Sequence, residues 1–241
     1  MSTLFLSDIH LEDSRPEALR WLTGFLAGPA REAEAVYILG DLFEYWIGDD
    51  APPPAARQLA SQTAALADTG VPCFFMHGNR DFLLGEAYAA AAGLRLLPET
   101  RVVDLYGRPT LLLHGDTLCT DDLAYQAFRA QSRNPAWQAA VLARSVEERI
   151  RMAGEARDAS RQHTGSAAMD IMDVNAAAVR EAFLQHDVRH MIHGHTHRPA
   201  VHQHDLGDGR SGERIVLADW YDHGSYLEVT PAGARSVPLP P

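Results

Sequence analysis

Runs of apolar residues alternate with amphipathic stretches along the first part of the chain. Three short runs, at 2–6, 36–39 and 73–76, are rich in apolar residues and end just before polar loops. Such runs are typical of strands that are covered on both faces of a sheet. Helices are predicted from Pro16 to Leu26 and from Pro52 to about Ala67, each with proline in its first turn. The alternation predicts an α/β fold.

The pattern changes beyond residue 100. Two runs, Arg101–Leu105 and Thr110–Leu113, flank Gly107 and predict a hairpin. Nearer the carboxyl end, a turn is predicted at 209–212 and strands at 215–217 and 226–229. A sandwich of two mixed sheets accommodates these elements better than one doubly wound sheet does.

Residues 121–168 interrupt the alternation with a stretch that has no strand pattern. Leu142, Val146 and Ile150 follow helical spacing, and seven Arg against six Asp and Glu make the segment slightly basic in an acidic chain. We predict a helical lid insertion over the site, within a single domain that spans 1–241. The alternative is an ordinary helical hairpin packed on the core.

Composition limits the classes of function. The 241 residues suffice for one large α/β domain, and the net charge of -11 argues against nucleic acid as a partner. No apolar run approaches the roughly 20 residues that span a bilayer. The expected compartment is therefore the cytoplasm. Cys73 and Cys119 provide no disulfide framework.

Metal-ligand residues follow five of the apolar runs. The five motifs are Asp8-Ile9-His10, Gly40-Asp41, Gly78-Asn79, His114-Gly115-Asp116 and Gly194-His195-Thr196-His197. Ligands bind at the carboxyl ends of strands in α/β sheets, so these loops can converge on one point. Two Asp, one Asn and four His, without thiolate, favour manganese, zinc or iron over a structural zinc site. The inventory predicts two divalent cations that share a carboxylate and clamp a phosphoryl group.

At these residues the chain resembles the calcineurin-like metallophosphoesterases. The resemblance covers nearly all of the chain outside 121–168 and implies a four-layer α/β/β/α sandwich with a dinuclear site. It implies that Asp8, His10, Asp41 and His197 hold one ion, and that Asp41, Asn79, His114 and His195 hold the other. Mn²⁺ is the metal that we expect first from this ligand set. The wider family has Gly-Asn-His followed by Asp or Glu, whereas this chain has Gly78-Asn79-Arg80-Asp81.

Arg80, in place of the histidine of the wider family, points to a narrower family within it. The stretches 40–50, 78–83 and 171–175 are similar to the UDP-2,3-diacylglucosamine diphosphatase family of the lipid A pathway. The resemblance implies water attack on the α-phosphorus, giving UMP and 2,3-diacylglucosamine 1-phosphate. The catalytic residues that we expect are Asp41, Asn79, Arg80 and His195. The substrate-binding residues that it implies are Asn79, Arg80, Asp122, Ser160, Thr164 and His195.

Two positions depart from that family, with Thr164 in place of Asn and Ala167 in place of Lys. Arg157 or Arg161 would then supply the missing charge. A lipid substrate implies that the protein works at the cytoplasmic face of the inner membrane, as a peripheral protein. The alternatives are another dinuclear phosphodiesterase or nucleotide pyrophosphatase, acting on dinucleoside polyphosphates or cyclic nucleotides, and a non-enzymatic scaffold of the same fold. No obligate protein partner is expected.

Overall fold

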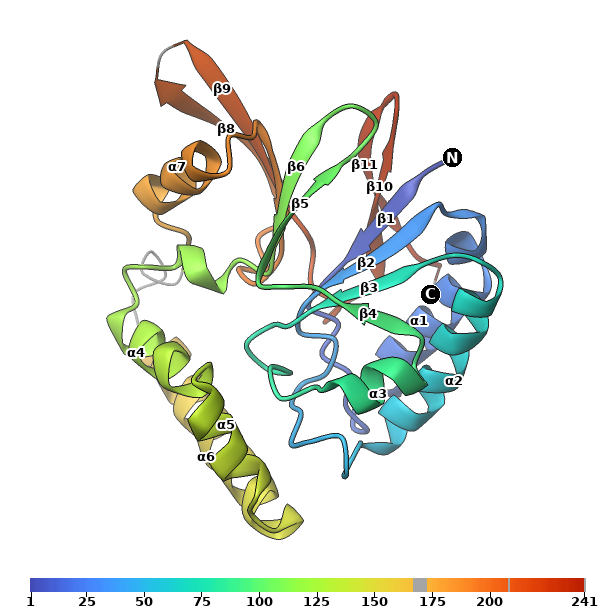
Figure 1. Ribbon diagram of the computed structural model, residues 1–241, viewed down its shortest axis with the longest axis vertical. Helices are drawn as coiled ribbons and strands as arrows, with labels where there is room; N and C mark the ends of the chain where they lie inside the picture. The colour runs from blue at the N-terminus through green and yellow to red at the C-terminus, as the bar shows by residue number, and fades with distance from the viewer. Residues whose placement is uncertain (167–172, 208, 241) are drawn as a thin grey trace.

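Two β-sheets packed face to face form the centre of the protein (Figure 1). The computed structural model describes residues 1–166, 173–207 and 209–240. The first sheet has the strand order β11-β10-β1-β2-β3-β4, and the second has the order β5-β6-β7-β9-β8. The first sheet comprises β1 (Thr3–Leu6), β2 (Ala35–Leu39), β3 (Cys73–Met76), β4 (Leu94–Leu96), β10 (Ser225–Thr230) and β11 (Gly233–Pro238). The second comprises β5 (Thr100–Asp104), β6 (Pro109–Leu113), β7 (His190–His193), β8 (Ala200–Gly207) and β9 (Arg210–Val216).

Both sheets are mixed, with a parallel core. Strands β1 to β4 pair in parallel, and β10 joins β1 in the antiparallel direction. In the second sheet β6, β7 and β9 are parallel, while the edge strands β5 and β8 are antiparallel to their neighbours. The carboxyl ends of the parallel strands therefore point to one end of the sandwich.

Helices cover the outer face of each sheet. The helices α1 (Pro16–Ala27), α2 (Pro54–Asp68) and α3 (Glu86–Ala91) pack on the first sheet, and α7 (Ala176–Gln185) packs on the second (Figure 1). Two short 3-10 helices span Pro29–Glu32 and Asp116–Leu118. The protein thus has the four layers α/β/β/α, and the predicted sandwich of two mixed sheets is confirmed.

The apolar core has three parts because strand side chains alternate between faces. In β1, Leu4 and Leu6 pack under the helices with Phe25 of α1. Phe5 points the other way and packs between the sheets with Ile192 of β7. All three β1 side chains are at most 1% exposed. This two-sided burial explains why β1 is a run of apolar residues.

The hairpin predicted around Gly107 is confirmed as β5 and β6, but the turn predicted at 209–212 extends too far, because only Gly209 of that range lies between β8 and β9. Strand β8 ends at Gly207, and β9 already begins at Arg210. Gly212 is therefore a strand residue. A Cβ atom there would lie 3.1 Å from the ring of Phe183, so this glycine allows α7 to approach the sheet closely.

Three helices occupy the segment that was predicted to be a helical insertion. They are α4 (Leu123–Ser132), α5 (Pro135–Leu142) and α6 (Val146–Ser166), and they extend away from the sheets at the lower left of Figure 1. Residues 167 and 168 of the predicted insertion lie outside the described residues. The role of this segment as a lid remains a prediction. Within the described ranges, no helix combines the length and apolar character needed to cross a membrane.

Candidate metal centre

The candidate ligands lie in the loops that directly follow the parallel strands. Asp8 and His10 follow β1, Asp41 follows β2, and Asn79 follows β3. His114 follows β6, while His195 and His197 follow β7. The two sheets therefore contribute ligands from opposite sides of one region.

These loops have a strained backbone. Among the described residues, seven that are not glycine have positive φ, and five of the seven are candidate ligands. The five are Asp8, His10, Asp41, His195 and His197, with φ between 51° and 70°. Left-handed residues cost roughly 1–3 kcal/mol each and persist where the surroundings enforce them, which is typical of functional sites.

Glycines let the loops approach one another. A Cβ atom on Gly78 would overlap the carboxylate of Asp41, and one on Gly194 would overlap the carboxylate of Asp8. Asp8 also accepts the backbone N–H of His195 at 2.9 Å. Loops from different sheets are thus joined at the site itself.

One group of donor atoms centres on Asp8. His197 Nε2 lies 3.3 Å from Asp8 Oδ1 and 3.4 Å from His10 Nε2. Asp8 is fully buried, yet its Oδ1 has no hydrogen-bond partner among the described residues. An unsatisfied buried carboxylate oxygen is costly, so this atom fits a bound cation.

A second group adjoins the first across Asp41. His10 Nε2 lies 3.8 Å from Asp41 Oδ2, and His114 Nε2 lies 3.7 Å from Asp41 Oδ1. Asn79 Oδ1 lies 3.0 Å from His114 Nε2 and 2.9 Å from His195 Nδ1. Asp41 therefore stands between the two groups, each carboxylate oxygen nearer one of them, as a bridging ligand requires.

Hydrogen bonds from the far side of two rings set which nitrogen can bind a metal. His10 Nδ1 lies 2.9 Å from Glu44 Oε2, and His114 Nδ1 lies 2.8 Å from the carbonyl of Leu39. Both partners are acceptors, so each Nδ1 carries the proton and each Nε2 presents a lone pair toward the site. Such outer partners orient metal-binding histidines.

The electrostatic surroundings keep two of the ligands, Asp8 and His195, in the form that binds a metal. Burial raises the pKa of Asp8, but the nearby His197 and the charges of His114 and His10 outweigh it, so that the pKa falls well below the usual range. Burial lowers the pKa of His195 to about 4. At neutral pH the site therefore offers an ionised carboxylate and a neutral imidazole. The donor set fits two divalent cations.

Arg80 and Asp81 point to different places, although they are adjacent in the chain. Arg80 Nη2 donates to Ser160 Oγ of α6 at 3.5 Å, and its buried Nε has no partner among the described residues. Asp81 is fully buried and accepts the backbone N–H groups of Leu42, Phe43 and Gly78. A surface pair between Arg80 and Asp81 is excluded by this arrangement.

The residues expected to bind substrate are only partly assembled. Ser160 lies beside Arg80, while Asp122 accepts the backbone N–H of Tyr125 and thereby caps α4. The side chain of Thr164 lies outside the described residues, as does Ala167. The substrate contacts remain predictions.

Two residues near the site, Glu44 and Tyr221, were not found from the sequence, which named Arg157 only as a replacement charge for substrate binding. Glu44 contacts His10, and Arg157 of α6 lies 3.2 Å from Glu44. Burial raises the pKa of Glu44, but the hydrogen bond from His10 and the charges of His10, Arg80 and Arg157 lower it to about 2. The ring of Tyr221 stacks on His10 with 5.3 Å between centroids. Each contact joins distant segments, so no local motif announces it.

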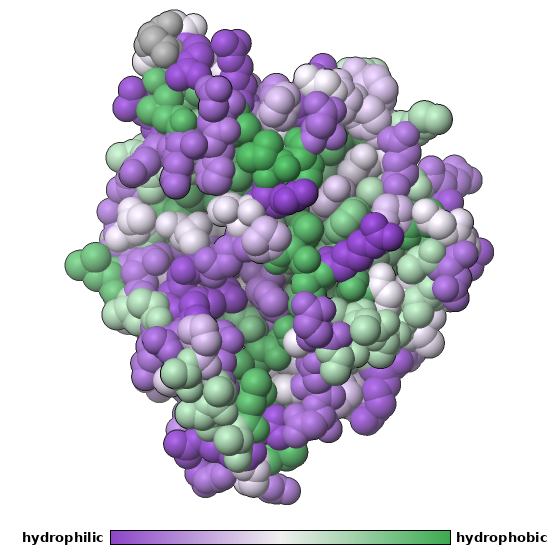
Figure 2. Space-filling model, in the orientation of Figure 1, coloured by the Kyte–Doolittle hydropathy of each residue, from purple (hydrophilic) through white to green (hydrophobic). Residues whose placement is uncertain are grey.

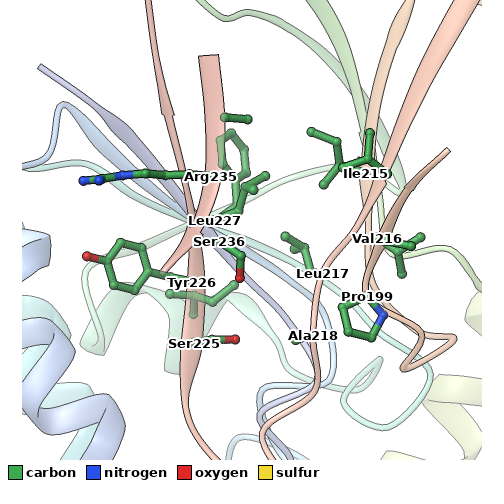
Figure 3. A pocket seen from close by; sticks show the side chains of 15 residues that line it. Pro199, Ile215, Val216, Leu217, Ala218, Ser225, Tyr226, Leu227, Arg235 and Ser236 are labelled. Carbon is green, nitrogen blue, oxygen red and sulfur yellow. The ribbon is translucent and has the colours of Figure 1, made fainter. Parts of the chain in front are cut away.

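An apolar cavity of about 200 Å³ lies at the edge of the sandwich, between the two sheets (Figure 3). Ile215, Val216 and Leu217 line one side, and Ser225 and Leu227 line the other. No carboxylate, histidine or cysteine lines it. The cavity therefore lacks the carboxylate and imidazole groups of the candidate metal centre.

Known proteins resemble the chain over nearly its full length. The sequence profile of the calcineurin-like phosphoesterases matches residues 1–199. A protein of Stenotrophomonas maltophilia (strain R551-3) named UDP-2,3-diacylglucosamine hydrolase is 52% identical, over 97% of this chain and 96% of the relative. One of the same name from Salmonella typhi is 49% identical over the whole of both chains. A solved hypothetical protein from Pyrococcus horikoshii OT3 has a TM-score of 0.51 at 11% identity, covering 99% of this chain and 87% of that one, which supports the fold alone.

Proposed function

Since this chain belongs to the calcineurin-like phosphoesterase family, we propose that it hydrolyses the diphosphate bond of UDP-2,3-diacylglucosamine. The products are UMP and 2,3-diacylglucosamine 1-phosphate, so the reaction is a step of lipid A synthesis. Full-length relatives that bear the corresponding name support this substrate. The observation that carries the proposal is the convergence of seven oxygen and nitrogen donors beside Arg80.

Two divalent cations would occupy the centre. We assign Asp8, His10, Asp41 and His197 to one, and Asp41, Asn79, His114 and His195 to the other. Mn²⁺ is the first choice for a carboxylate, amide and imidazole set. When bound, such ions polarise phosphoryl oxygens and lower the pKa of a water.

The residues of the chain orient the diphosphate. Arg80 has two roles available, because its backbone N–H donates to Asp41 at 2.9 Å while its guanidinium extends toward α6. A guanidinium binds two phosphate oxygens at once and stabilises charge that develops on them. The leaving sugar phosphate needs little protonation, so Arg80 can stand where the wider family has histidine.

The helical insertion would hold the acyl chains. Leu123, Phe128, Leu142 and Ile150 of α4 to α6 are large apolar residues with exposed side chains. Hydrophobic residues also gather in a strip alongside α5, on the side that faces the rest of the protein (Figure 2). Ser160, together with Asp122 and Thr164, would contact the headgroup. A substrate with two acyl chains resides in a bilayer, so we propose peripheral association with the cytoplasmic face of the inner membrane.

Turnover of defined substrates tests the proposal. The purified chain with Mn²⁺ should release UMP from UDP-2,3-diacylglucosamine much faster than it cleaves dinucleoside polyphosphates or cyclic nucleotides. UDP-glucosamine without acyl chains is the matched control for the lipid portion. Equal rates with and without the acyl chains would contradict the proposed role of the insertion. Preference for a cyclic nucleotide would contradict the assigned reaction.

A further inference from the structure

One face of α6 meets the loops that carry the candidate ligands. Arg157 and Ser160 are three residues apart and therefore lie on the same side of the helix. Ser160 meets Arg80 in the loop after β3. Arg157 covers the ring of Tyr45, in the loop after β2, with 5.4 Å between guanidinium carbon and ring centroid.

Polar contacts continue from Arg157 to a candidate ligand. Arg157 Nε lies 3.2 Å from Glu44 Oε1, and the other oxygen of Glu44 accepts His10 Nδ1 at 2.9 Å. Arg157 Nη2 also donates to Glu12 Oε2 at 3.4 Å. The helical insertion is thus connected through one carboxylate to the ring of His10.

Burial makes this connection energetically significant. Glu44 is 8% exposed, and the side chain of Arg157 is 23% exposed. A carboxylate so far removed from water depends on its charged and hydrogen-bonded partners. The carboxylate behind a metal-binding histidine also fixes the ring orientation and makes the facing nitrogen a better donor.

We propose that Glu44 and Arg157 are positioning residues that couple the docking of α6 to the metal centre. Arg157 holds Glu44, and Glu44 holds His10 in the orientation that a metal ion requires. The inference rests on the metal centre proposed above. Coupling between sites is reciprocal, so Mn²⁺ bound at His10 also holds α6 more firmly against the loops.

Binding of Mn²⁺ alone to the full chain tests the coupling. Equilibrium dialysis measures the affinity of wild type, Glu44→Ala, Arg157→Gln and Arg157→Lys. The matched control is Arg151→Gln, which removes the same charge from α6 at a side chain that is 66% exposed and pairs with Glu155. Hydrogen exchange of α6 amides, with and without Mn²⁺, reports the reciprocal effect.

Loss of the outer partner of a metal-binding histidine typically weakens metal binding by about 10–100-fold. Glu44→Ala should therefore weaken the Mn²⁺ site that contains His10 by about tenfold or more. Arg157→Gln should weaken it by about threefold or more, while Arg157→Lys and Arg151→Gln remain within about twofold of wild type. In combination with Glu44→Ala, Arg157→Gln should add no further loss, because it acts through Glu44. Mn²⁺ should slow exchange in α6 of wild type and not of Arg157→Gln.

Different outcomes overturn different statements. A wild-type chain that binds no Mn²⁺ overturns the proposed metal centre and this coupling with it. Wild-type binding that Arg157→Gln leaves unchanged overturns the coupling alone. If Arg157→Gln raises KM for the lipid nucleotide without changing Mn²⁺ affinity, Arg157 is a substrate contact instead. If the losses of Mn²⁺ affinity multiply in the double variant, Glu44 and Arg157 act independently, and the coupling is overturned.

Discussion

Replacing Asp81 should loosen the loops after β2 and β3, because its carboxylate joins these two ligand-bearing loops. One oxygen accepts Leu42 N–H at 2.7 Å and Phe43 N–H at 3.3 Å, next to Asp41. The other accepts Gly78 N–H at 2.8 Å, next to Asn79. Asp81 is fully buried, so no solvent would replace these bonds without rearrangement.

The expected cost follows from the donors that lose their partner. Asp81→Ala leaves three backbone N–H groups unsatisfied, at about 1–3 kcal/mol each. The bond to Phe43 is the longest, and burial with the charge of Asp41 raises the pKa of Asp81 to about 6, so lost repulsion offsets part of the cost. We expect a loss of about 3–5 kcal/mol for Asp81→Ala. Asp81→Asn keeps one acceptor oxygen and should lose about 1–2 kcal/mol.

Urea denaturation of the chelated protein measures these losses without the contribution of metal binding. The melting temperature should fall by roughly 6–20 °C in Asp81→Ala, since 1 kcal/mol corresponds to about 2–4 °C for a chain of this length. Asp13→Ala, at an exposed carboxylate, is the control and should change stability by about 0.5 kcal/mol at most. A loss below about 1 kcal/mol in Asp81→Ala would refute the inference that Asp81 joins the loops.

Three further predictions concern the metal centre. Asp41→Ala should remain folded by circular dichroism yet bind fewer than two ions and lose activity, because one carboxylate serves both; near-normal turnover would exclude a bridging role. Exhaustive chelation should abolish turnover and Mn²⁺ should restore it, whereas full activity in metal-free protein would contradict metal dependence. Arg80→Lys keeps the charge but loses the planar fork, so the fall in kcat/KM should correspond to a loss of about 1.5–3 kcal/mol in transition-state stabilisation. Arg80→Ala should lose at least as much, with metal content unchanged. If kcat/KM falls by less than about fivefold in Arg80→Ala, which is roughly 1 kcal/mol, Arg80 does not take part in the mechanism.

The sequence by itself determined the elements whose signal is local. Strands β1, β2 and β3 are buried on both faces, so their apolar runs were visible without any knowledge of their neighbours. The hairpin of β5 and β6 was visible from Gly107 between two such runs. Strands β8 and β11 were missed because they are edge strands with exposed polar residues, and their pairing partners alone make them strands.

The candidate ligands were also predicted from the local sequence, since each follows a strand whose end is marked by glycine or a polar residue. Their assigned roles remain predictions. Tertiary structure alone decided the left-handed backbone at Asp8, His10 and Asp41, because that conformation is enforced by crossing loops. It also decided that Asp81 points inward while Arg80 reaches α6. Sequence neighbours share a backbone but not an environment, and the environment is supplied by segments that only folding brings together.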